Sequence, residues 1–526
     1  MSESTSSSTL SRRNTLILVV LGLAQLMVVL DLTVMNIALP SAQRALHFTT
    51  ADRQWVVTAY SLSFGSLLLL GGKLSDLLGR RLTFLIGLAG FAGVSAIGGA
   101  SVNFPMLITA RACQGAFAAL LVPTALSLLT TTFTEPKARN AAFGVFGAVA
   151  GAGGAVGLLL GGVLTEYLSW RWTLYVNLVF AGAAFVGGAL LLVRQPSPAR
   201  PRLDIPGVVL VSGSLFCLVY GFSNAASHSW ATPSTYGFLA AGVALLVVFA
   251  AWQVQAAHPL LPPRVVLDRD RSGAYLAMLF VSAGLFGIFL FLTYYLQQTL
   301  GYSPLVTGVA FLPLSVGIIV AANLSTIVLM PRVGPRPLVT FGLLAAAGGA
   351  LWLAQLSPHT GYSSGVLGPI LVTGIGMGLV FAPAINAGTF GVVPEDAGVA
   401  SATLNVGQQL GASIGTSLLN SIFATAVASY LAGHLASARL IGRQALNTQA
   451  QVHGYTTSFW WTAGIFAGGA VICGALFRPG LMGQTDTPSP AQAEVPTAPQ
   501  SPGGPGPNSP GMTRVDPAVL PSRESP

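Results

Sequence analysis

Long apolar segments separated by short polar stretches run along most of the chain. About twenty apolar residues in an α-helix are enough to cross the hydrocarbon core of a bilayer, which is roughly 30 Å thick. The pattern predicts fourteen membrane-spanning helices, at residues 15–39, 52–72, 82–102, 105–132, 139–163, 171–193, 205–223, 235–256, 272–297, 305–330, 336–356, 364–389, 398–425 and 457–477. The expected fold is an all-α polytopic membrane protein with both termini on one side of the membrane.

Basic residues indicate which side that is, because loops rich in Lys and Arg stay in the cytoplasm. With the amino terminus inside, only five of the 24 basic residues fall in outer segments, namely Arg44, Arg53, Arg171, Arg439 and Arg443. We therefore expect both termini to be cytoplasmic. Residues 1–14 would form a short polar tail, and residues 483–526, rich in Pro, Gly and Ser, a disordered one.

Composition agrees with a protein surrounded by lipid. Charged residues make up 7% of the chain and hydrophobic residues 53%, whereas an ordinary soluble domain has about 25% charged residues. The net charge of +9 is spread thinly between apolar segments and is accompanied by no basic stripe, so no nucleic-acid partner is expected. No Cys or His has a partner at metal-ligand spacing, and we expect no metal site.

Two charged residues lie inside predicted spans, where an unpaired charge is costly. Asp31 and Arg111 lie roughly 12 Å and 9 Å below the outer ends of their helices, at 1.5 Å per residue. Their similar depths would let them meet if the first and fourth helices are neighbours, and Gln114 and Gly115 share the face of Arg111. Such a pair could serve only to fix helix register, or Asp31 could be a protonatable carboxylate whose charge gates transport.

A short loop between the second and third spans carries an informative motif. It reads Gly72-Lys73-Leu74-Ser75-Asp76-Leu77-Leu78-Gly79-Arg80-Arg81. The pattern G-x-L-x-D-x-x-G-R-R resembles the loop signature of the major facilitator superfamily. Three other segments resemble the signatures of its fourteen-helix drug:proton antiporter family: Leu30 to Pro40, Arg111 to Gly115, and Tyr295 to Pro313.

This resemblance implies an architecture, a location and an activity. The architecture is two pseudo-symmetric six-helix halves, residues 15–193 and 272–477, with an inserted two-helix hairpin at 204–256. The location is the bacterial cytoplasmic (inner) membrane, and the activity is export of amphipathic drugs or antibiotics in exchange for protons. The resemblance implies that Asp31 binds the proton and that Arg111 stabilises its charge. The cytoplasmic gating loop would consist of Gly72, Asp76, Gly79, Arg80 and Arg81. Residues that support the cavity or the coupling would be Asn36, Gln114 and Gly115.

The fifth span departs from the family's glycine-rich antiporter signature at one position. Leu158 stands where the family has proline. Gly153, Gly157 and Gly161 still form a small-residue stripe at spacing four, followed by Gly162, which permits close helix packing. Because proline would kink the helix, its absence predicts a straighter fifth helix and leaves the direction of exchange open.

The second half carries no charged residue at mid-membrane depth. Its candidate substrate-lining residues are aromatic or amide side chains: Tyr294, Tyr295, Asn323, Asn386, Gln408 and Gln409. A pocket of this kind suits small amphipathic molecules rather than multiply charged ones. No nucleotide-binding loop occurs, so the chain is not expected to be an enzyme, and a proton gradient rather than a cofactor would supply energy.

These observations favour a monomeric proton-coupled exporter in contact with the lipid bilayer, protons and small amphipathic substrates. Two alternatives stay open from the residues alone. One is an uptake transporter or lipid flippase of the same fold. The other is a membrane scaffold or sensor that transports nothing, although a scaffold would have no need of a buried carboxylate.

Overall fold

The protein is a helical bundle in the computed structural model, which describes residues 12–49, 52–133, 135–193, 204–227, 230–256, 259–392, 397–434 and 442–480. Within these ranges every regular element is a helix and none is a strand. Twelve of the described helices are long and apolar enough to cross a membrane. The second and fifth predicted spans correspond to two further helices of 26 and 32 residues. The count of fourteen and the side on which the termini lie stay predictions.

The first six helices form one group. In chain order they are α1 (Arg12–Leu46), α2 (Arg53–Leu78), α3 (Arg80–Gly99), α4 (Phe104–Thr132), α5 (Pro136–Tyr167) and α6 (Trp172–Leu191). Within this first group α1 packs on α5 and α6, α4 packs on α2 and α3, and α3 packs on α6.

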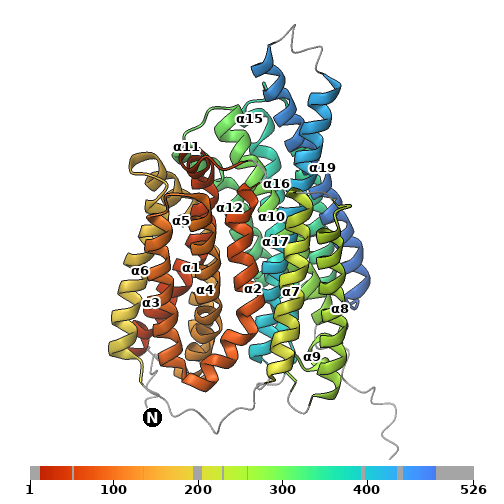
Figure 1. Ribbon diagram of the computed structural model, residues 1–526. Helices are drawn as coiled ribbons and strands as arrows, with labels where there is room; N and C mark the ends of the chain where they lie inside the picture. Colours follow the sequence, from red (N-terminus) through yellow and green to blue (C-terminus); the bar gives the residue numbers. More distant parts are fainter. Residues whose placement is uncertain are drawn as a thin grey trace, which may run out of the picture. The chain divides into compact units, whose positions relative to one another are not determined.

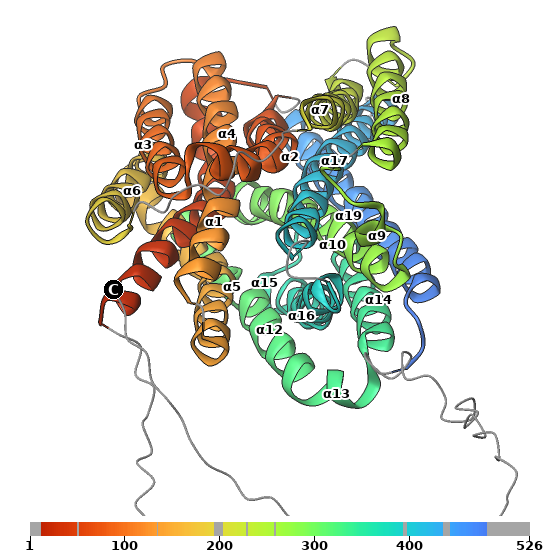
Figure 2. The same ribbon diagram turned by 90° about the horizontal axis from the view of Figure 1, so that it is seen from below.

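A second group lies beside the first in Figure 2. Its elements are α10 (Arg269–Tyr294), η1 (Tyr295–Thr299), α11 (Pro304–Ala310), α12 (Leu312–Leu324), η2 (Ser325–Leu329), α13 (Met330–Val333), α14 (Pro335–Leu353), α15 (Tyr362–Gly365), α16 (Leu367–Thr389), α17 (Ala397–Gly433) and α19 (Arg443–Leu476). Here α10 packs on α17 and α19, α16 packs on α12 and α14, and α14 packs on α19. The first group's contacts thus recur, with α10, α12, α14, α16, α17 and α19 in place of α1 to α6.

This recurrence is what two pseudo-symmetric halves would produce. The described residues, 12–480 with the gaps given above, nevertheless form one compact unit. The boundaries expected inside that unit, at residues 193, 204, 256 and 272, therefore stay predictions. The remaining residues, including the tail expected at 483–526 and most of the tail expected at 1–14, lie outside the described ranges.

The inserted hairpin consists of α7 (Ile205–Ser227) and α8 (Pro233–Gln255), followed by the short α9 (Pro263–Val266). The two long helices pack on each other, and α7 also contacts both α2 and α17, so the hairpin touches both groups. Figure 1 shows α9 at the lower end of the bundle and α11 and α15 at the upper end.

Several helices extend beyond their predicted apolar spans. The first helix begins at Arg12 and continues through Pro40 to Leu46, because a proline in a membrane helix is tolerated where neighbouring helices accommodate it. The last begins at Arg443, fourteen residues before the predicted start at 457, since its first turns are polar and do not register in an apolar scan.

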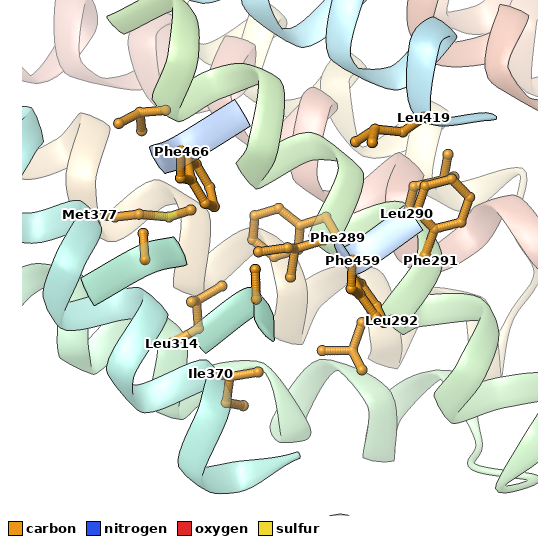
Figure 3. Packing of buried hydrophobic residues seen from close by; sticks show 14 of the residues in the cluster. Phe289, Leu290, Phe291, Leu292, Leu314, Ile370, Met377, Leu419, Phe459 and Phe466 are labelled. Carbon is orange, nitrogen blue, oxygen red and sulfur yellow. The ribbon is translucent and has the colours of Figure 1, made fainter. Parts of the chain in front are cut away.

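The core of the second group is built from aromatic and aliphatic side chains. Phe289 from α10 lies between Phe459 and Phe466 from α19, with Met377 and Ile370 from α16 nearby (Figure 3). Phe291, two residues further along α10, stacks on Phe423 of α17. These side chains are almost fully removed from the surface. They fix α10 against α16 and α19 and so position the residues at its upper end.

Candidate functional site

A buried ion pair occupies the centre of the first group. The Asp31 and Arg111 side chains are 2% and 1% exposed, and Arg111 Nη1 donates to Asp31 Oδ2 at 2.5 Å. Asp31 Oδ1 accepts two more hydrogen bonds, from Asn177 Nδ2 at 2.8 Å and from Gln114 Nε2 at 3.2 Å. The structure therefore brings together the two charges that their depths predicted to meet, and adds donors from α4 and α6.

Arg111 is held on its other sides by α2 and α4. Its Nε donates to the carbonyl of Val56 at 3.1 Å, and its Nη1 donates to Gln114 Oε1 at 3.0 Å. The guanidinium carbon lies 4.6 Å from the centre of the Tyr60 ring, a cation–π contact. These contacts would keep Arg111 in place when the charge on Asp31 changes.

Gln114 links the pair to α3, since its Nε2 also donates to Ser95 Oγ at 2.7 Å. Gly115 lets α2 approach α4, because a Cβ there would run into the Tyr60 carbonyl oxygen. Asn36 is not part of this network: it is buried, but its Nδ2 donates to Leu32 of its own helix at 3.2 Å.

The glycine stripe of α5 faces the helix that carries Asp31. A Cβ at Gly153 would lie 3.0 Å from Val29, one at Gly157 would collide with Thr33, and one at Gly161 would lie 3.0 Å from the Cα of Val34. We call this contact the α5–α1 glycine seam. Gly162 points elsewhere, toward α11, where a Cβ would lie 2.7 Å from the Cα of Leu305.

Leu158 also lies against the second group. Its side chain is fully buried, and its carbonyl oxygen is so close to Gly308 of α11 that a Cβ on that glycine would collide with it. Helix α5 runs unbroken from Pro136 to Tyr167, and whether the absence of the family's proline makes it straighter stays a prediction. It thus contacts Asp31's helix on one face and the second group on another.

The two groups meet closely at the end of the bundle where α2 begins, which we call the Arg53 end. Tyr294 Oη donates to Gln43 Oε1 at 2.7 Å, and Gln297 Nε2 donates to the carbonyl of Ile37 at 3.1 Å. Glu166, at the end of α5, accepts hydrogen bonds from Ser303 Oγ at 2.6 Å and from the backbone N–H of Leu305 at 2.9 Å. This carboxylate caps the amino terminus of α11 from across the interface.

The predicted gating loop lies at the opposite end of α2. Gly79, between α2 and α3, has a φ of +88°, a conformation that L side chains rarely adopt. Arg81 Nη2 donates to the carbonyl of Ala189 at 2.6 Å, which ties the start of α3 to the end of α6. Gly72 faces Pro123 of α4 with room for a Cβ, and Arg80 is partly buried. The backbone of Asp76 lies in the last turn of α2.

The candidate substrate-lining residues do not converge on one pocket. Tyr294 and Tyr295 are fully buried, and Tyr295 Oη donates to the carbonyls of Ser357 and Thr360. Asn323 and Asn386 are exposed and bond only to their own helices. Gln408 is partly buried, whereas Gln409 is buried beside Gly65 of α2 with its Oε1 unbonded.

Sequence reasoning missed several residues of the network. Asn177, Ser95 and Tyr60 are uncharged, and nothing in the apolar pattern separates them from other polar residues in spans. Arg53 was predicted to lie on the outer side, which stays a prediction, and its burial at the start of α2, 1% exposed, was missed. A second glycine stripe was also missed, although the sequence shows it: Gly407, Gly411 and Gly415 repeat the spacing of four seen in α5.

That second stripe forms a matching contact. A Cβ at Gly407, Gly411 or Gly415 of α17 would collide with backbone carbonyls of α10. The middle glycine of each seam lies against a leucine: Gly157 against Leu30 and Gly411 against Leu279. Leu279 is therefore equivalent to Leu30. The next residue in each helix is then also equivalent, which pairs Asp31 with Phe280. Its ring packs on Gly469 of α19, the helix equivalent to the one that supplies Asn177. The buried charge therefore belongs to one group, and an aromatic ring replaces it in the other.

A repeated six-helix arrangement with a buried acid–base pair in one copy defines a multi-pass membrane transporter rather than an enzyme. The family model described as Major Facilitator Superfamily matches residues 21–416. The chain belongs to this family.

Its relatives carry names tied to antibiotics. The chain is 46% identical over 461 residues to the puromycin resistance protein pur8 of Streptomyces alboniger, covering 87% of this chain and 90% of that protein. It is 40% identical over 393 residues to the cephamycin export protein CmcT of Amycolatopsis lactamdurans, covering 74% and 81%. These relatives agree with the resemblance to drug:proton antiporters and with a location in the bacterial inner membrane.

Solved structures support the fold. A bacterial homologue of the human lysosomal transporter Spinster, crystallised in an inward-facing and occupied conformation, superposes with a TM-score of 0.62. The match covers 89% of this chain and 98% of that one at 15% identity. At that identity the likeness concerns the fold alone.

Proposed function

We propose that the protein exports amphipathic antibiotics or related drugs in exchange for protons, with Asp31 as the proton-binding group. The observation that carries the proposal is the buried Asp31–Arg111 pair. A charged residue at membrane depth is costly, and those that occur usually belong to a substrate or proton pathway. The resistance and export names of the relatives support an antibiotic substrate.

A proton on Asp31 would remove the negative charge that faces Arg111 Nη1. Arg111 would keep its bonds to Val56 and Gln114, so the change would fall on α1. Because the α5–α1 glycine seam leaves no space between the two helices, a shift of α1 would move α5 and its contact with Gly308 of α11. Protonation would in this way reach the interface between the two groups.

Under the predicted orientation, the Arg53 end faces outward and the conformation described here is closed on that side. Arg81 and Gly79 would then hold the cytoplasmic ends of α3 and α6 as one unit during the movement. The protein would work as a monomer in the lipid bilayer, with no bound cofactor, and the inward gradient of protons would drive export.

The test is drug efflux from an efflux-deficient bacterial host, with puromycin and a cephamycin as first substrates, in the presence and absence of a protonophore. Asp31→Asn should abolish efflux without loss of membrane insertion, because the amide keeps the shape of the side chain but cannot carry the proton. Asp31→Glu should retain part of the activity. Glu135→Gln, which changes an exposed carboxylate ahead of α5, is the matched control and should leave efflux unchanged.

Other outcomes would overturn the proposal in distinct ways. Undiminished proton-driven efflux by Asp31→Asn would return Asp31 to a role in helix register. Accumulation of the drugs inside cells would indicate uptake, and movement of labelled lipid without drug would indicate a flippase. No transport of any compound in reconstituted vesicles would favour a scaffold.

A further inference from the structure

Arg53 is a buried cation without an acidic partner. Its side chain is 1% exposed, and none of the ion pairs that the structure shows within its described residues includes it. Its Nε donates to Asn420 Oδ1 at 3.3 Å, while its Nη2 has no hydrogen-bond partner. A buried charge left without a carboxylate needs another source of stabilisation.

Aromatic rings of the second group supply it. The guanidinium carbon lies 4.2 Å from the ring centre of Tyr294, 4.6 Å from that of Phe423 and 5.6 Å from that of Phe291. Tyr455 stacks on Phe423 with ring centres 5.2 Å apart and closes the arrangement from α19. We call these four rings the aromatic cage.

The cage and its occupant come from different groups. Its rings lie on α10, α17 and α19, whereas Arg53 begins α2. The rings are buried and pack on one another, with Phe291 and Phe423 stacked at 5.4 Å, so the cage is formed by the second group's own packing. A movement that separates α2 from α17 would withdraw Arg53 and leave the cage standing.

The chemistry of the empty cage is that of a site for organic cations. Ring faces attract weakly hydrated cations such as guanidinium and quaternary ammonium groups. The polar atoms beside the guanidinium are the amide oxygen of Asn420 and the hydroxyls of Tyr294 and Tyr455. These neutral groups favour a single positive charge and give a small inorganic cation no carboxylate ligand.

We propose that the aromatic cage is a binding site for monovalent organic cations that Arg53 fills as a built-in ligand in this conformation. In the conformation with the groups parted at this end, a free cation takes the place of Arg53. The two occupants compete, so a bound cation shifts the population toward the parted conformation. This site is separate from Asp31 and does not depend on the compound that is exported.

Binding of N-methylguanidinium to the purified full-length protein, measured by titration calorimetry, tests the proposal. Arg53→Gln removes the built-in ligand and should bind the probe about tenfold more tightly than the unmodified protein. Arg53→Gln combined with Phe423→Ala should lose that gain. Arg171→Gln is the matched control, because Arg171 makes a comparable contact with the Trp170 ring inside one group, at 4.6 Å, and should leave binding unchanged.

A second measurement keeps the test decisive if Arg53→Gln fails to assemble. Spin labels at Val102 and Gln444, both exposed, report the separation of the two groups at the Arg53 end. The probe should increase the long-distance population in the otherwise unmodified protein and have no effect with Phe423→Leu. Equal probe affinity in Arg53→Gln and the unmodified protein, or an unchanged distance distribution with the probe at saturation, would overturn the proposal.

Discussion

Two arginines, Arg53 and Arg111, are fully buried in the part of the chain that the structure describes, and they are stabilised in different ways. Arg111 faces a carboxylate, and that carboxylate in turn accepts N–H donors from Gln114 and Asn177. Arg53 faces ring faces and one amide oxygen. A carboxylate can lose its charge by taking up a proton, whereas a ring cannot. The Arg111 contact can therefore respond to protons, and the Arg53 contact can respond only to movement or to a competing cation.

Asn177 is expected to stabilise the protein through Asp31. Asn177→Leu keeps a similar volume but removes the 2.8 Å donor to a buried carboxylate, which should cost about 1–3 kcal/mol. The melting temperature of the purified protein measures the loss. Asn386→Leu is the matched control, since that exposed amide donates only to Ala382 of its own helix. A fall in melting temperature no larger than the control's would show that the bond to Asp31 contributes little.

Among single residues, the sequence identifies the buried charged residues of the network better than the uncharged polar residues that bond to them. Asp31 and Arg111 stand out because charge is rare within apolar spans, and their depths match. Asn177, Ser95 and Tyr60 give no such signal, because only the packing of α2, α3 and α6 around the pair shows which polar residues face it. The burial of Arg53 was missed because it lies at a span boundary, where the sequence reads equally well as loop or helix.

Among the helices, α5 is the one that links the helix carrying Asp31 to the second group. Its glycines face α1 at the level of Asp31, while Leu158 and Gly162 face α11. Against α1 these glycines meet the short, branched side chains of Val29 and Thr33 and the backbone of Val34, and the contact with α11 is backbone to backbone. Neither contact has a long flexible side chain that could absorb a displacement. Helix α5 is therefore expected to move with α1 as one body.

Gly308→Ala tests the contact between α5 and α11. The new methyl group would collide with the Leu158 carbonyl, and such overpacking costs about 1–3 kcal/mol. We expect a lower melting temperature and a longer distance between the groups at the Arg53 end. Gly348→Ala in α14, where a Cβ meets open space, should change neither quantity. Equal melting temperatures for the two variants would contradict a close α5–α11 contact.

The hairpin is held at its α9 end by Asp204. Burial alone would raise the pKa of this carboxyl, but hydrogen bonds from Trp252, Gln253 and the Gly207 backbone outweigh it and lower the pKa below 3.8. A lowered pKa means that the contribution to stability is complete above pH 3.8 and is lost as the pH falls through the lower, folded-state value.

Asp204→Asn should therefore lower the melting temperature at neutral pH and reduce its further fall in acid. The measurement is the melting temperature from neutral pH to below pH 3.8. Asp268→Asn is a suitable comparison, because Asp268 also caps a helix, accepting from the Arg271 backbone at 3.1 Å, but is more exposed. A variant that keeps the full acid dependence would exclude Asp204 as its source.

Helix positions follow from the apolar pattern, because lipid demands long apolar runs. Helix ends do not, since α1, α17 and α19 continue beyond their apolar spans with residues that water or neighbouring helices accommodate. The breaks at η1 and at Phe311, between α11 and α12, also left no trace in the hydropathy. The substrate-lining set stays a prediction, because residue type suggests a pocket but only packing in a substrate-bound state decides which side chains meet.

For the whole molecule, the repeated contacts of the two groups matter less than the position where they differ. The same glycine seam joins α5 to α1 and α17 to α10. At the equivalent position the first group has Asp31, bonded to Asn177, and the second has Phe280, packed on Gly469. The second group keeps the framework without the titratable residue.

This asymmetry has an electrical consequence under the proposed exchange. With Asp31 as the single proton-carrying group of the proposed exchange, one proton enters for each molecule that leaves. Export of a neutral compound then moves one net charge across the membrane, and export of a monovalent cation moves none. Each 100 mV of membrane potential then contributes about 2.3 kcal/mol to the first process and nothing to the second. In proteoliposomes, an imposed potassium diffusion potential should accelerate efflux of a neutral substrate and leave efflux of a cationic one unchanged. Equal acceleration of both would require a second charge to move, at a place other than Asp31.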